Sequence, residues 1–248
     1  VIASNGTKGT ARVVDALTGA FVYSPNPNVN GTDVFTYRVS DQYLESNVAT
    51  VTVTISPVND ASVAQNKSIT TDEDTSISSS LSASDVDSSE STFRVVANGT
   101  KGTATIVDPA AGTVLYVPNR NDFGRDSFTY VVNDGTDDSN PAIVSVYINP
   151  INDAPVAQSK TLLTTEDVTT SGTLSAFDVD TPTLTHRIVA NGSKGTAVVT
   201  NTAIGSFVYS PNQDQNGTDT FTFSTSDGLL VSNIATVTVN ISSVNDRP

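Results

Sequence analysis

Acidic residues recur along this chain at an interval of 93 residues. Of its 26 Asp and Glu residues, seventeen return in every copy that covers their position. A solvated surface needs negative charge but not at fixed positions, whereas a hard cation such as Ca²⁺ needs about six to eight oxygen ligands held in place. Since the chain has no Cys and a single His, the recurring oxygens predict a Ca²⁺ site. The recurring residues are Asp33/Asp126/Asp219, Asp41/Asp134/Asp227, Asp60/Asp153/Asp246, Glu73/Glu166, Asp74/Asp167, Asp85/Asp178 and Asp87/Asp180.

Other motifs return on the same spacing, so the chain is an internal repeat. The sequence NGTKGT at 5–10 reappears at 98–103 and, with one change, at 191–196. A repeat of 93 residues has the size of a small β-sandwich. The expected organisation is an incomplete first repeat at 1–57, complete repeats at 58–150 and 151–243, and the start of a further linker at 244–248.

The first repeat lacks the positions equivalent to 58–93 of the second. Two explanations stay open. In one, the chain is a piece of a longer repeat array. In the other, a neighbouring chain donates the missing strands, as in strand complementation.

Short runs that alternate apolar and polar residues predict seven strands in the second repeat, because turn signals such as Asn-Gly and Asp-Gly separate them. In the last run, Val144, Val146 and Ile148 share one face. No segment has apolar residues at helical spacing, so the predicted fold is all-β, a tandem of seven-stranded Greek-key sandwiches placed end to end. The expected strands are 63–69, 76–83, 93–97, 103–107, 113–117, 127–132 and 142–148.

Two further recurring sets are interpreted as structural. The aromatics Tyr23/Tyr116/Tyr209 and Phe35/Phe128/Phe221 are predicted to lie in the cores. Lys8/Lys101/Lys194 stands between glycines and is predicted to lie at a hairpin tip, where the glycines supply unusual backbone angles.

The composition excludes several classes of function. A net charge of −14 and a pI near 4.1 argue against nucleic acid or an anionic membrane as a partner, because both require a basic face. No apolar run is long enough to span a bilayer. The lone His186 takes the place of Phe93 in the preceding repeat and is interpreted as a tolerated surface or edge residue. We therefore expect no catalytic activity.

Three motifs together resemble bacterial cadherin-like tandem repeats, the VCBS-type extender repeats of large secreted RTX adhesins. They are the linker NDAP at 152–155, the pair Asp178 and Asp180, and the run 124–130 that precedes Asp134. The resemblance covers the whole chain. It implies cadherin- or immunoglobulin-like sandwiches, an extracellular location at the bacterial cell surface or in secreted form, and Ca²⁺ bound between successive repeats.

The resemblance also implies which residues hold the ions. The linker has NDA where animal cadherins have a longer DxNDN run, so the number of ions at each junction stays open. The implied ligands are Asp33, Asn59, Asp60, Asp85, Asp87 and Asp134 for the first junction; Glu73, Asp126, Asn152, Asp153, Asp178, Asp180 and Asp227 for the second; and Glu166, Asp219, Asn245 and Asp246 after the third repeat.

The expected function is that of a non-catalytic stalk, an extender segment of an adhesin that Ca²⁺ stiffens. Its partners are then neighbouring repeats of the same or an adjacent chain. One alternative is a self-assembling extracellular filament whose first repeat is completed by another chain. Another is a module that binds carbohydrate or pairs with its own kind on other cells, for which Tyr43 and Tyr147 are the candidate exposed aromatics.

Overall fold

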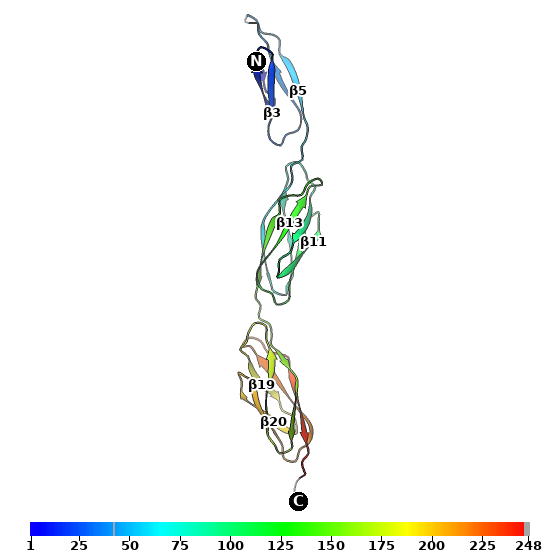
Figure 1. The fold of residues 1–248 in the computed structure, drawn as a ribbon, viewed down its shortest axis with the longest axis vertical. Coiled ribbons are helices and arrows are strands. Elements are labelled where there is room, and N and C mark those ends of the chain that lie inside the picture. Colours follow the sequence, from blue (N-terminus) through cyan, green and yellow to red (C-terminus); the bar gives the residue numbers. More distant parts are fainter. Residues whose placement is uncertain (42, 246–248) are drawn as a thin grey trace. The chain divides into compact units, whose positions relative to one another are not determined.

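The computed structural model describes residues 1–41 and 43–245, so the predicted ligand Asp246 lies outside it. Within these ranges the chain forms strands and turns and contains no helix (Figure 1). It divides into two compact units, Val1–Asn149 and the part from Pro150 onward. Across the same ranges, no helix is present that could cross a membrane. The predicted all-β class is thus confirmed.

The second repeat is a sandwich of a four-stranded and a three-stranded sheet. All neighbours are antiparallel except β14 and β7, which run parallel. The larger sheet has the order β10 (Thr92–Ala97), β13 (Gly124–Asn133), β14 (Ala142–Asn149), β7 (Lys67–Asp72). The smaller has the order β11 (Gly102–Asp108), β12 (Thr113–Pro118), β8 (Ile77–Ser80).

All seven predicted strands of this repeat are present, but the first two are each divided. Short strands β6 (Val63–Ala64) and β9 (Ala83–Ser84) pair with each other outside the two main sheets. The breaks fall where the hydroxyl of buried Tyr130 donates to the carbonyls of Gln65, at 2.6 Å, and Ser82, at 2.8 Å. The Ser82 carbonyl also accepts the amide of Gln65 at 3.0 Å. The third repeat divides the same two strands although Phe223 stands in place of Tyr130, so the hydroxyl is not the cause of the breaks.

The third repeat has the same strand order, with antiparallel pairing except between β16 and β23. The larger sheet is β16 (Lys160–Thr165), β23 (Ala235–Ser242), β22 (Gly217–Ser226), β19 (Thr185–Ala190). The smaller sheet is β17 (Thr170–Thr173), β21 (Ser206–Pro211), β20 (Gly195–Asn201), and β15 (Val156–Gln158) pairs with β18 (Ser175–Phe177).

The recurring aromatics form the cores of the two complete repeats, as predicted. Tyr116 stacks on Phe128 with ring centroids 6.1 Å apart, and Tyr209 stacks on Phe221 at 6.0 Å. All four rings are buried. The inward side chains of β14 and β23 belong to the same two core clusters.

The first repeat consists of β1 (Ile2–Ser4), β4 (Gly31–Tyr37) and β5 (Ala49–Ile55) in one sheet, and β2 (Gly9–Asp15) with β3 (Ala20–Pro25) in the other. In the described part of the chain, no strand lies along the outer edge of β5 or of β3. Phe21 on β3 is consequently 45% exposed, whereas its equivalents Val114 and Phe207 are 0% and 1% exposed.

The interpretation of His186 as a surface residue is wrong. It lies on the edge strand β19, but its side chain turns inward and the residue is only 6% exposed. Its Nδ1 makes a 2.8 Å hydrogen bond with the Thr225 hydroxyl. Burial lowers the pKa of His186, because the charged imidazolium is disfavoured away from water.

Candidate metal centre

A tight turn after β13 fixes the carboxylate of Asp134. Its Oδ1 accepts the backbone amides of Thr136 and Asp137, both at 2.7 Å. Gly135 has a φ of 101°, a left-handed conformation that favours glycine at this position of the turn. Asp134 is only 5% exposed, so a negative charge is held at this end of the repeat.

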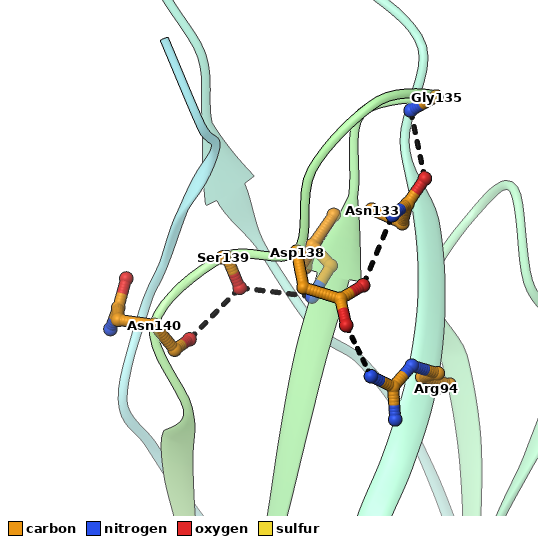
Figure 2. Close-up of polar contacts among 7 residues, drawn as sticks. Arg94, Asn133, Gly135, Asp138, Ser139 and Asn140 are labelled. Atoms are coloured by element: carbon orange, nitrogen blue, oxygen red, sulfur yellow. Dashed lines mark hydrogen bonds and ion pairs between the residues drawn. The ribbon is translucent and has the colours of Figure 1, made fainter.

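The rest of the loop braces that turn (Figure 2). Asp138 accepts a hydrogen bond from the Asn133 side-chain amide at 3.0 Å and forms an ion pair with Arg94 on β10. Asn133 in turn accepts the amide of Gly135 at 2.9 Å, and the Ser139 hydroxyl accepts the amide of Val132 at 3.0 Å. The loop is therefore tied to β10 and β13 on both sides of Asp134.

The linker before the second repeat returns to this turn. The Asn59 side-chain amide donates to Asp134 Oδ2 at 2.9 Å, across 75 residues of sequence. The backbone amide of Asp60 donates to Asp87 Oδ2 at 3.0 Å, and the amide of Asp87 donates to Asp85 Oδ1 at 2.9 Å. We call Asn59, Asp60, Asp85, Asp87 and Asp134 the second linker cluster.

The third repeat contains the same contacts at equivalent residues. Asn152 donates to Asp227 Oδ2 at 2.7 Å, and the amide of Asp153 donates to Asp180 Oδ2 at 2.7 Å. The amide of Asp180 donates to Asp178 Oδ1 at 2.9 Å. We call Asn152, Asp153, Asp178, Asp180 and Asp227 the third linker cluster. Ten of the predicted ligands are thus gathered in two matching sets.

Local hydrogen bonds favour the charged form of the turn carboxylate in each cluster. The amide of Asp137 and the Asn59 side chain lower the pKa of Asp134, whereas the neighbouring Asp85 carboxylate raises it. Asn152 and the amide of Leu230 lower the pKa of Asp227. The ion pairs among the described residues, Arg38–Glu45 and Arg94–Asp138, involve neither cluster directly.

One buried oxygen in the third linker cluster has no hydrogen-bond donor. In the second repeat, Asp85 Oδ2 accepts the Ser62 hydroxyl at 2.7 Å. The equivalent of Ser62 in the third repeat is Pro155, which cannot donate, and Asp178 Oδ2 is buried with no partner in the described part of the chain. A buried carboxylate oxygen without a donor is unfavourable, and a cation would satisfy it.

The donor atoms of both clusters are the carboxylate and amide oxygens that Ca²⁺ prefers. In this structure the carboxylates do not point to one common position. Within residues 1–41 and 43–245, no group of three or more acidic or His side chains is close enough to hold an ion. Backbone amides occupy Oδ1 of Asp134 and Asp85, while each Oδ2 accepts a single hydrogen bond. A carboxylate oxygen can accept about two. These Oδ2 atoms keep capacity for a cation, and rotation of the Asn59 amide would offer its oxygen.

At the other end of the third repeat, Glu166 lies beside the linker that follows. Its Oε1 accepts the amide of Val244 at 2.6 Å, and its Oε2 accepts the Asn216 side-chain amide at 3.2 Å. Glu166 is 5% exposed and its equivalent Glu73 is 4% exposed. The predicted ligand Asn245 directly follows the residue that Glu166 holds.

The remaining predicted ligands, Asp33, Asp126 and Asp219, each bind a turn within their own repeat. Asp126 accepts the amides of Thr100 at 3.0 Å and Lys101 at 3.3 Å, and the Tyr116 hydroxyl at 2.6 Å. Asp33 has the equivalent partners. Asp219 accepts the Ser193 amide and the Tyr209 hydroxyl. These carboxylates organise the fold, and metal binding by them stays a prediction.

This arrangement also explains NGTKGT and corrects its interpretation as a hairpin tip. The segment crosses between sheets, from β10 to β11 in the second repeat. Gly99 and Gly102 have no left-handed backbone angle; a Cβ on Gly99 would lie 1.9 Å from Asp126, and one on Gly102 would lie 2.3 Å from Tyr116. Both glycines make room for a close approach. The Lys101 ammonium donates to the Phe123 carbonyl, which closes the turn.

Two contributors to the clusters were missed in the sequence. Asp137 Oδ2 accepts the Asn59 side chain at 3.3 Å, yet Asp137 does not recur in the other repeats, so recurrence does not mark it. Ser62 carries no charge, and only its loss at Pro155 marks the position. The difference between Ser62 and Pro155 is visible in the sequence when the linkers of successive repeats are aligned.

Comparisons with known proteins show the family and the fold of the chain. The family model described as "Bacterial Ig domain" matches residues 1–54 and 59–147, together more than half of the chain. The model described as "Bacterial cadherin-like domain" matches residues 152–243. No curated protein matches the chain in sequence.

Two solved structures share the fold. Mouse Cadherin-23 EC22-24 is 17% identical with a TM-score of 0.61, over 94% of this chain and 82% of that one. Protocadherin Gamma B2 extracellular cadherin domains 1-5 is 17% identical with a TM-score of 0.62, over 96% of this chain and 53% of that one. An endo-fucoidan hydrolase from glycoside hydrolase family 107 is 16% identical with a TM-score of 0.35, and the chain covers 39% of it.

Proposed function

We propose that this chain, which belongs to the bacterial Ig domain family and carries a bacterial cadherin-like domain at 152–243, is a non-catalytic extender segment of a bacterial adhesin at the cell surface or in secreted form. Tandem sandwiches of these families suit an extracellular stalk or adhesion role. In this proposal, the second and third linker clusters bind Ca²⁺, and the bound ion stiffens the chain.

The observation that supports it most strongly is the repetition of one set of linker contacts. In both complete repeats a linker Asn donates to the Asp of the turn 75 residues later, and the next amide donates to an Asp 27 residues later. Ordinary turn capping explains an Asp at one turn. It does not explain why a linker and two separate loops of acidic residues meet at the same place twice.

When bound, Ca²⁺ would supply a dication that neutralises these carboxylates and joins them through shared coordination. Two carboxylates about 4 Å apart repel by roughly 1 kcal/mol in water and by about 4 kcal/mol at an effective dielectric constant near 20. Hydrogen bonds already join each linker to the repeat that follows it. A bound ion would therefore restrict the motion of the linker further. Extracellular Ca²⁺ modules bind with a Kd of about 10⁻⁴ to 10⁻³ M.

The other predicted ligands extend the proposal. They lie at the opposite ends of the repeats or in the linker that follows the third repeat, and each is expected to add oxygen donors at a junction. These residues are Asp33, Glu73, Asp126, Glu166, Asp219, Asn245 and Asp246.

A carbohydrate-binding or homotypic role has less support. Tyr43 is 88% exposed and Tyr147 is 47% exposed, but they belong to different repeats. They therefore do not form the paired aromatic surface on which a sugar ring would stack. Catalysis is also unsupported, since the lone His186 is buried and its Nδ1 makes a hydrogen bond with the Thr225 hydroxyl.

Thermal melting and small-angle scattering of the whole chain, in Ca²⁺ and in EGTA, test the proposal. We expect Ca²⁺ to raise the melting temperature and to narrow the distribution of interatomic distances obtained from the scattering. The variant Asp134→Asn should lose the part of both Ca²⁺-dependent changes that comes from the second linker cluster. Asp108→Asn is a matched control, because Asp108 caps two amides in the same way but contacts no linker. Equal responses in both variants would contradict the proposal.

A further inference from the structure

Five Asn-Gly pairs occur in the sequence, at 5–6, 30–31, 98–99, 191–192 and 216–217. An Asn side chain can react with the backbone amide nitrogen of the residue that follows it. Glycine leaves that nitrogen least shielded, because it has no Cβ. The reaction converts the side-chain amide into an acid without an enzyme. The five pairs lie in two different electrostatic environments.

The pair Asn216–Gly217, at the start of β22, lies against a cation. The Lys194 ammonium donates to the backbone carbonyl of Asn216 at 2.7 Å. This carbonyl belongs to the same peptide group as the Gly217 amide. Gly217 has a φ of 91°, and a Cβ at this position would lie 2.9 Å from the Lys194 nitrogen. The positive charge is therefore next to the peptide group whose nitrogen would react.

The first repeat has the same arrangement and the second repeat lacks its reactive side chain. Lys8 donates to the backbone carbonyl of Asn30 at 2.6 Å, and Gly31 follows. In the second repeat Lys101 donates to the carbonyl of Phe123, which has no amide to lose. The lysine thus closes this turn in every repeat, but it meets an Asn-Gly pair only in the first and the third.

The other three pairs lie against an anion. In the third repeat, a Cβ on Gly192 would lie 2.1 Å from Asp219 Oδ1. The Asn191 Oδ1 accepts the amide of Ala197 at 2.6 Å, which holds the side-chain carbonyl on β20. The equivalent pairs of the first and second repeats have the same two contacts.

The nearby charge should decide which pairs react. The reaction begins when the glycine amide loses its proton, and the resulting negative charge is shared with the carbonyl oxygen of the same peptide group. A cation on that oxygen stabilises the anion, whereas a neighbouring carboxylate disfavours it. Lys194 and Lys8 therefore favour the reaction, and the carboxylates beside the other three glycines oppose it.

We propose that Asn216–Gly217 is a site of self-modification, in which the chain itself and water are the only reactants. The Gly217 nitrogen attacks Asn216 Cγ, so that an N–Cγ bond forms and the Cγ–Nδ2 bond breaks. The side-chain nitrogen leaves as ammonia with the proton that the glycine amide has lost. Water then opens the cyclic imide to aspartate or isoaspartate. No oxidant or reductant is needed.

The product changes a contact that reaches the following linker. The Asn216 side-chain nitrogen donates to Oε2 of buried Glu166 at 3.2 Å, and Glu166 Oε1 accepts the amide of Val244 at 2.6 Å. After the reaction, a carboxylate replaces the donor and faces Glu166, so two like charges repel each other. The hold of Glu166 on Val244 should then weaken.

Peptide mapping by mass spectrometry, after incubation of the whole chain in neutral buffer, tests the reaction. Asn216 and Asn30 should deamidate about tenfold faster than Asn98 and Asn191. In urea the rates should become similar, because Asn30, Asn98 and Asn216 all begin the tripeptide Asn-Gly-Thr. Equal rates at all of these sites in the folded chain would overturn the proposal.

Variants of Lys194 separate its charge from its packing. Lys194→Met should slow the reaction at Asn216 by about tenfold, because a charge-assisted hydrogen bond is lost. The reaction at Asn30, which has its own lysine, should be unchanged in the same molecules and serves as the internal control. Lys194→Arg keeps a cation and should keep the fast rate. Loss of the fast rate in both variants, or in neither, would overturn the role of the charge.

Hydrogen exchange tests the effect on the linker. Asn216→Asp supplies the acid directly and should speed amide exchange at Val244. Asn30→Asp is the matched control, because it adds the same charge without a contact to Glu166, and exchange at Val244 should stay as in the original chain. Unchanged exchange at Val244 in Asn216→Asp would overturn the proposed effect of the modification.

Discussion

The hydrogen bond from Tyr116 to Asp126 separates two roles for the recurring set Asp33, Asp126 and Asp219. The Tyr116 hydroxyl is buried and donates to Asp126 Oδ2 at 2.6 Å. If Asp126 serves mainly to hold the turn at 98–103, loss of this bond should destabilise the second repeat to the same extent with and without Ca²⁺. We therefore expect Tyr116→Phe to lower its stability independently of the ion.

The size of the effect follows from the bond. A hydrogen bond to a charged group contributes about 1.5 to 3 kcal/mol to stability. For a domain of this size, about 1 kcal/mol shifts the melting temperature by roughly 4 to 8 °C. The second repeat of Tyr116→Phe should thus melt about 6 to 24 °C lower.

The same variant has an expected pH signature. Burial, together with Asp126, raises the pKa of Tyr116 above its usual value near 10. The unfolded phenol therefore ionises first, so wild-type stability is full below pH 10 and falls as the pH rises above it. The Phe variant should lack this part of the alkaline loss.

Differential scanning calorimetry of the whole chain in EGTA and in Ca²⁺ gives the comparison. Tyr147→Phe is the control, because Tyr147 is 47% exposed and loses no buried hydrogen bond. A destabilisation by Tyr116→Phe that appears in Ca²⁺ but not in EGTA would refute the reasoning. It would show that Asp126 acts through the ion.

Two further substitutions test the packing. His186→Phe, which copies Phe93, should reduce the loss of stability of the third repeat between pH 7 and pH 5, measured by urea unfolding. Burial lowers the pKa of His186, so the unfolded chain takes up the proton first as the pH falls through about 6.5, and stability drops below that point. An unchanged pH profile would contradict this. Gly102→Ala should destabilise the second repeat because the new Cβ would lie 2.3 Å from the Tyr116 hydroxyl, whereas Thr103→Ala, on the exposed face of β11, should have little effect in the same calorimetric assay.

Alternation along the strands was enough to predict the all-β fold, since Val144, Val146 and Ile148 face the core as expected. It could not predict the breaks in the first two strands of the repeat. At these breaks β6 leaves the larger sheet to pair with β9, and β15 pairs with β18 in the same way in the third repeat. Local periodicity carries no information about such a contact.

Recurrence identified the residues of the linker clusters but not their separate roles. Asp126 and Asp134 recur equally, yet one binds a turn beneath Tyr116 and the other receives the linker Asn59. A carboxylate that holds a turn and a proposed metal ligand can recur equally, so recurrence alone does not separate the two roles. Asp137 shows the converse, because a residue present in a single repeat still contacts Asn59.

The position of the ion itself is the most direct test of the central proposal. Crystals of the chain grown with Ca²⁺, or with Tb³⁺ in its place, would locate it by anomalous scattering. We predict one peak in each cluster, about 2.3 to 2.6 Å from a carboxylate oxygen of Asp134 in the second linker cluster and of Asp227 in the third, with Asp178 Oδ2 among the ligands in the third. Clusters that keep their present hydrogen bonds, with no anomalous peak at saturating ion, would contradict it.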